Sequence, residues 1–152
     1  MRSIAALAGL EGILKQSYAL AYTAAPPFFT QYKATNAQLR KGVQVVSGYL
    51  GRNQPQHLDK LRGATPVGDD IQEKYLRVGG EMSWGILTLD YKLQRPARQR
   101  VQKAWDVLDQ SFTPERGEVK VAPVLLKLMN PPYGFDYNQL TLLFCAWFGH
   151  NQ

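Results

Sequence analysis

The stretch LLKLMNPPYGFDYNQLTLLFCAWF, residues 125–148, decides the fold that we expect for this chain. Two apolar runs flank Asn130-Pro131-Pro132-Tyr133-Gly134, whose composition is typical of a turn. Asp136 or Asn138 can cap the helix that follows, from about Tyr137 to Phe148. Its apolar residues cover so much of the helix circumference that we expect neighbours on two sides. They are Leu140, Leu142, Leu143, Phe144, Trp147 and Phe148.

Upstream, apolar residues recur at steps of three and four and predict further helices. The helix at about 96–112 has the clearest pattern, since Val101, Trp105, Leu108 and Phe112 share one face and Pro96 suits a first helical position. The other helices are expected at about 3–22, 36–50, 56–61, from Asp69–Asp70 to Leu76, and within 119–129. Residues 1–22 look faintly like a signal peptide, but we interpret them as an amphipathic helix.

Residues 84–93 follow a different pattern. Leu87, Leu89, Tyr91 and Leu93 alternate with polar residues, and this period of two favours a short strand or hairpin. We therefore expect a mainly α fold of about six helices in one compact domain, residues 1–152, with at most this one extended element. Residues 119–148 are expected to form a helix-turn-helix-like corner.

Composition limits the classes of partner. The chain has 152 residues, a net charge of +6 and a pI near 9.5, which favours an acidic partner such as DNA or an acidic protein surface. Its one cysteine, Cys145, cannot form an internal disulfide, and this favours a reducing cytoplasm. No run of apolar residues is long enough to cross a membrane, so we expect no membrane contact.

No residue pattern indicates a catalytic site, a metal site or a cofactor. The sequence has no phosphate-binding loop and no nucleophile elbow, and His57 and His150 lack partners at ligand spacing. Cys145 lies among apolar neighbours, which favours a buried, unreactive thiol. The acidic group Asp69, Asp70 and Glu73 suits a helix start better than a cation, although a small metal-dependent enzyme is kept as a third hypothesis.

A basic stretch is the strongest candidate for nucleic-acid binding. On a helix that begins near Pro96, Arg95, Arg98 and Gln102 would share a face that could hold phosphates, and Tyr91 could stack on a base. An ordinary solvated helix face is the alternative. The candidate DNA-binding residues are Lys92, Arg95, Arg98, Arg100 and Lys103.

The order of several features resembles a known family. Residues 22–27 (Tyr-Thr-Ala-Ala-Pro-Pro) precede the helix at 35–50, Ala104-Trp105 lies in a later helix, and Pro131-Pro132-Tyr133-Gly134 separates two apolar helices. This layout, over about 13–149, resembles a region of the large BREX-type phage-defence ATPases (BrxC and PglY) and their relatives. The resemblance implies a helical module downstream of an ATPase core, in contact with DNA or a partner subunit. The ATPase motifs are absent here, so the activity is not carried over.

Two functions follow as hypotheses. The first is a non-catalytic module of a larger bacterial phage-defence ATPase that contacts DNA through the basic stretch. The second is a protein–protein assembly module with an interaction face at Leu140, Phe144 and Trp147. Because the last helix is strongly apolar, we expect the chain to be a fragment whose partners are other domains or subunits of a larger complex.

Overall fold

The computed structural model describes residues 36–60, 66–80 and 82–152, and the helix predicted at about 3–22 lies outside them. The described part is mainly α, as predicted. A π-helix, Ile71–Leu76, continues α6, and a 3-10 turn, Pro114–Arg116, follows α7. The α-helices are α4 (Asn36–Gly51), α5 (His57–Lys60), α6 (Pro66–Asp70), α7 (Gln99–Ser111), α8 (Val121–Met129) and α9 (Tyr137–His150).

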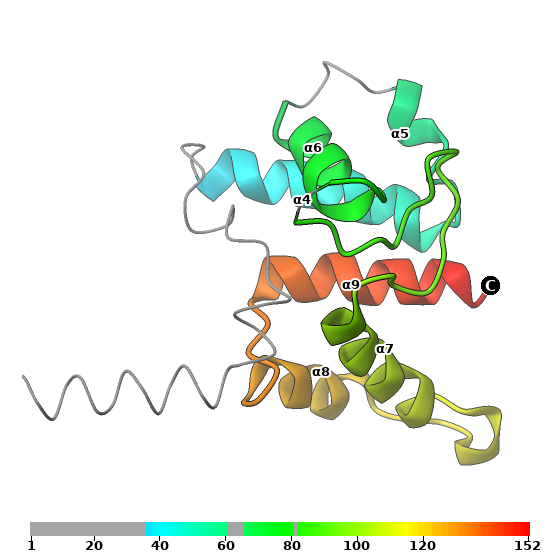
Figure 1. The fold of residues 1–152 in the computed structure, drawn as a ribbon. Helices are drawn as coiled ribbons and strands as arrows, with labels where there is room; N and C mark the ends of the chain where they lie inside the picture. Colours follow the sequence, from blue (N-terminus) through cyan, green and yellow to red (C-terminus); the bar gives the residue numbers. More distant parts are fainter. Residues whose placement is uncertain (1–35, 61–65, 81) are drawn as a thin grey trace, which may run out of the picture.

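Helix α9 lies at the centre of the described fold. Figure 1 shows α4 on one side of it and α7 and α8 on the other. Asp136 caps its first turn: its carboxylate accepts from the Gln139 backbone N–H at 2.8 Å, and the Gln139 side chain accepts from the Asp136 N–H at 3.0 Å. This capping box fixes where α9 begins. The prediction of a helix with neighbours on two sides is confirmed.

The contact between α4 and α9 is very close. The predicted α4 stripe of Leu39, Val43, Val46 and Leu50 is buried. Gly149 meets the end of this stripe, where a Cβ would lie 1.8 Å from the Leu50 carbonyl oxygen. Only a residue without a side chain permits this approach of the two backbones.

The segment predicted as a short strand or hairpin forms no strand in the described residues, but the chain reverses there and one antiparallel bridge joins Leu87 to Leu93. It makes isolated bridges only, Arg77 with Leu87 and Leu87 with Leu93. The chain reverses at residues 88–91, where the Tyr91 N–H donates to the Thr88 carbonyl at 3.0 Å and Tyr91 has a φ of 58°. This turn places Leu89 in solvent, 63% exposed, so the alternation of apolar residues did not reflect a strand.

Helix α7 begins at Gln99, three residues later than predicted. The Ala97 N–H donates to the Gly85 carbonyl and the Arg98 N–H to the Trp84 carbonyl, both at 3.2 Å, so residues before Gln99 pair with the backbone of residues 84–85 instead of forming a helical turn. Arg98 itself has extended backbone angles. The core face of α7 is as predicted, since Val101, Trp105 and Leu108 are buried.

Helices α8 and α9 are joined by a turn that contains a cis peptide bond between Pro131 and Pro132. The two helices pack against each other, but the helix-turn-helix likeness of this unit is not confirmed. Among residues 36–60, 66–80 and 82–152, no helix combines the length and the apolar character needed to span a bilayer.

Candidate functional site

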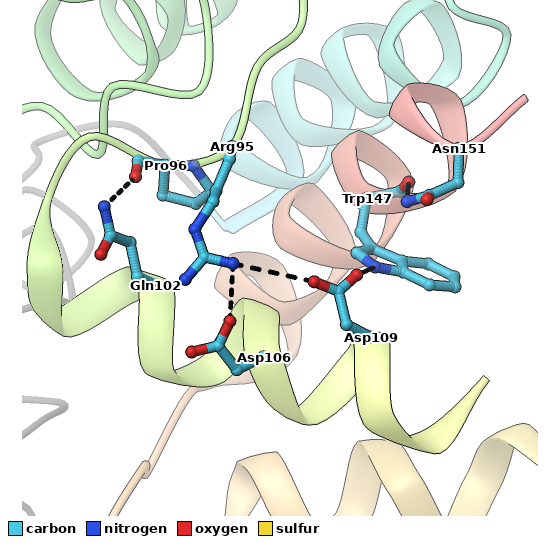
Figure 2. A network of polar contacts seen from close by, with 7 residues as sticks. All are labelled: Arg95, Pro96, Gln102, Asp106, Asp109, Trp147 and Asn151. Carbon is cyan, nitrogen blue, oxygen red and sulfur yellow. Dashed lines mark hydrogen bonds and ion pairs between the residues drawn. The ribbon is translucent and has the colours of Figure 1, made fainter. Parts of the chain in front are cut away.

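Some side chains of the basic stretch make contacts within the fold. Arg95 Nη1 lies 2.6 Å from Asp106 Oδ1 and 3.8 Å from Asp109 Oδ2 (Figure 2). Asp109 also accepts a hydrogen bond from Trp147 Nε1 at 2.8 Å, so the network links the segment before α7 to α7 and α9. Arg95 therefore serves a structural contact within the fold.

The shared helical face predicted for Arg95, Arg98 and Gln102 does not form, and their binding of phosphate stays a prediction. The predicted face assumed a helix from Pro96, whereas Arg98 precedes α7 and its Nε donates to the Ser83 carbonyl at 3.1 Å. Gln102 Nε2 donates to the Pro96 carbonyl at 2.8 Å (Figure 2). The remaining members of the stretch, Lys92, Arg100 and Lys103, are exposed.

The acidic group Asp69, Asp70 and Glu73 is not arranged as a metal site. Asp70 pairs with Lys74 at 3.5 Å, and Asp69 accepts a hydrogen bond from Gln72 at 3.3 Å. Nowhere in the described part of the chain do three His, Cys, Asp or Glu side chains gather closely enough to hold a metal ion. The described residues thus give the hypothesis of a metal-dependent enzyme no support.

An apolar groove lies between α8 and α9. It has a volume of about 310 Å³. Three of its lining side chains are large, apolar or aromatic, and exposed: Leu126 (55%), Met129 (39%) and Tyr137 (73%). The complete lining is Ala122, Leu125, Leu126 and Met129 of α8 and Tyr137, Leu140, Thr141, Phe144 and Cys145 of α9.

The predicted interaction face divides between this groove and the core. Leu140 and Phe144 line the groove, but Trp147 is buried. The Trp147 indole N–H donates a hydrogen bond to Asp109, and its ring packs against Phe112, the C-cap of α7, with 5.3 Å between the ring centroids. The α8 contribution was missed by sequence reasoning. Its signal was the adjacent pair Leu125-Leu126, which a single helix face cannot bury together.

Chemically, the groove can bind apolar groups but offers no reactive group. Burial raises the pKa of the Cys145 thiol, so this side chain stays protonated at neutral pH. Thr141 donates its hydroxyl hydrogen to the Tyr137 carbonyl within α9, at 2.7 Å. The lining therefore favours a ligand with apolar side chains over a charged or reactive one.

The helices near the groove carry basic residues and no acidic ones. Helices α4, α8 and α9 contain no Asp or Glu, and they carry exposed Arg40, Lys41 and Lys127. Asp136 lies just before α9, where its carboxylate caps that helix. A second depression, of about 280 Å³, adjoins the groove because Tyr137 and Thr141 line both; Arg40, Val43, Gln44 and Asn138 complete it.

Comparison with known proteins finds no family model that matches the chain and no solved structure that matches it. The relationship to the BREX-type ATPases thus stays a prediction.

Proposed function

We propose that this chain is a helical docking module whose α8–α9 groove binds an amphipathic helix of a partner protein. The observation that carries the proposal is the groove itself, because its apolar lining includes Leu126, Met129 and Tyr137, all exposed in the isolated chain. Exposed apolar surface of this kind marks interaction sites, and a groove between two helices suits the apolar stripe of a third.

The charges around the groove specify the partner further. With Arg40 in the adjoining depression and no acidic residue in α4, α8 or α9, the bound helix should carry Asp or Glu beside its apolar stripe. Each large apolar side chain that becomes buried in the groove contributes about 1.5–3 kcal/mol before the costs of association. Two or three such side chains therefore contribute roughly 3–9 kcal/mol, from which the costs of association are subtracted.

This proposal corresponds to the assembly hypothesis from the sequence. If the resemblance to phage-defence ATPases is correct, the partner is another domain or subunit of that complex. DNA binding is the alternative, supported by the exposed Lys92, Arg100 and Lys103 and weakened by the internal contacts of Arg95 and Arg98. If this alternative is correct, the chain binds duplex DNA in a salt-sensitive way, and reversal of charge at Arg100 and Lys103 abolishes the binding.

The docking proposal is tested by fluorescence polarisation with a synthetic peptide of roughly 18 residues, long enough to be helical, with leucine at helical spacing and glutamate beside it. The full chain should bind this peptide, and Leu126→Asp should weaken the binding at least about tenfold, which corresponds to 1.4 kcal/mol. Leu89→Asp is the matched control, since Leu89 is also more than half exposed but lies outside the groove. Equal loss in both variants would count against the groove.

A further inference from the structure

The second depression lies on the other side of α9 from the groove. Figure 1 shows α8 on one side of α9 and α4 on the other, and the depression is lined by α4 and α9. Tyr137 and Thr141 of α9 line both the depression and the groove. A helix bound in the groove therefore runs next to the depression, whose volume is about 280 Å³.

The lining of the depression differs in chemistry from that of the groove. The groove is lined mostly by apolar and aromatic side chains, whereas the depression contains the guanidinium of Arg40 and the carboxamides of Gln44 and Asn138. A guanidinium has five N–H donors and a permanent charge, and each carboxamide has two more N–H donors. Among the described residues, no Asp or Glu lines the depression. A positively charged lining with many donors suits a carboxylate.

These donors come from two helices and border the same space. Arg40 and Gln44 are four residues apart and share a face of α4, and Asn138 lies in the first turn of α9. Within the described ranges, none of these three side chains makes a hydrogen bond or an ion pair. Arg95 and Arg98, in contrast, bind groups of the chain itself. The guanidinium in the depression is therefore available to a ligand.

The carboxylate of Asp136 lies close to this end of α9 in the sequence, but it has a different role. It accepts the Gln139 backbone N–H at 2.8 Å and does not line the depression. Its charge is directed at the N-terminus of α9, where the helix dipole offsets it. Asp136 therefore does not take the place of a ligand carboxylate beside Arg40.

We infer that the depression receives one carboxylate of the bound helix, from an Asp or Glu within about one turn of its apolar stripe, and that Arg40 selects acidic partners. This inference rests on the proposed function, since it names the residue that gives the groove its specificity. The residues shared by groove and depression, Tyr137 and Thr141, span only about 6 Å of α9 at 1.5 Å per residue. The acid must therefore lie close to the apolar stripe of the partner.

The inference is tested on the full chain with two forms of the synthetic peptide, one with glutamate and a twin in which every glutamate is glutamine. Glutamate flanks both ends of the leucine stripe, so either direction of binding brings one carboxylate to the depression. The two residues have similar helix propensities, so the twins are equally helical. The wild-type chain should bind the glutamate peptide about fivefold more tightly, as expected for a well-placed ion pair that is partly exposed. Arg40→Gln should bind both peptides equally.

Lys41→Gln is the matched control. Lys41 is the next residue of α4, is exposed, and lines neither the depression nor the groove. The substitution removes the same charge as Arg40→Gln and should keep the preference for glutamate. Equal loss of the preference in both variants overturns the inference, because the preference would then reflect only the net charge of the chain.

Asn138→Asp tests the depression from the side of α9. It keeps the size of the side chain and adds a negative charge in the first turn of α9, where the helix dipole favours it. The variant should bind the glutamate peptide about tenfold more weakly and the glutamine twin as the wild type does. Thermal unfolding shows whether each variant keeps its fold. An unchanged preference in both Arg40→Gln and Asn138→Asp overturns the inference.

The peptide pair also separates this inference from the proposed function. If the wild-type chain binds both peptides equally and Leu126→Asp weakens both, the carboxylate site is overturned and the docking function is left intact. Absence of binding of both peptides to the wild-type chain overturns the docking function, and the inference with it.

Discussion

The two sides of α9 differ in how closely the neighbouring helix packs against them. Toward α4, Gly149 has no side chain, so the two helix backbones approach closely. At the same contact, a Cβ on Gly51 would lie 3.8 Å from the Cβ of Cys145. Toward α8, Leu140 and Phe144 stand beside a groove of about 310 Å³ that α8 leaves open. Both sides are apolar. The difference shows that apolar composition alone does not distinguish a core contact from a binding surface: the size of the side chains at the contact does.

The largest expected effect comes from adding a side chain at Gly149, where α9 approaches α4 most closely. Gly149→Ala places a Cβ 1.8 Å from the Leu50 carbonyl oxygen, and either backbone can relieve the clash only by moving. We expect a loss of about 3 kcal/mol or more in the free energy of unfolding, measured by urea denaturation. Gly48→Ala, an exposed α4 position whose Cβ would meet only the flexible Arg52 end at 3.6 Å, is the control and should stabilise by about 0.5–1 kcal/mol. Tolerance of Gly149→Ala would contradict the close packing.

The second prediction compares two leucines of α8. Leu128 is fully buried and Leu126 lines the groove half exposed. Leu128→Ala should cost about 2–4 kcal/mol in thermal or urea unfolding, because it leaves a cavity. Leu126→Ala should change stability by less than about 1 kcal/mol, since its side chain is largely in solvent. Equal costs would mean that the groove is part of the core.

A third, smaller effect is expected where α7 meets α9. Trp147→Phe retains most of the aromatic packing on Phe112 but removes the hydrogen bond to Asp109. We expect a loss of about 1–2 kcal/mol, because the acceptor is charged but partly hydrated. Asp109→Asn in the Trp147→Phe background should then cost little more, and a full additional loss would show that the two groups act independently.

How much of this could be read from the sequence depended on whether the relevant contact was local. The α4 stripe ending at Leu50 follows from short-range chemistry and was predicted correctly, and Asp136 was one of the two predicted caps of α9. The predicted helical face with Arg98 does not form, because residues near Gly85, distant in sequence, hold Arg98 in an extended conformation. Of the predicted strand or hairpin, only a turn at Tyr91 and one antiparallel bridge between Leu87 and Leu93 are present. Of the groove, Leu140 and Phe144 were found, but its α8 wall depends on how two helices pack, which periodicity does not encode.

The smallest prediction concerns Cys145, which belongs to both sides of α9, since it lines the groove and contacts the α4 end. Burial raises its pKa in the folded chain, so the folded state favours the protonated thiol. Stability from this group is fully present below the unfolded pKa, about 8.5, and is lost as pH rises through the folded value. Urea midpoints should therefore decline slightly above about pH 8.5, and Cys145→Ala should remove part of that decline because alanine does not ionise. An identical alkaline decline in the variant would mean that the thiol is as hydrated as in the unfolded chain, and that the groove is more open than the α4 contact allows.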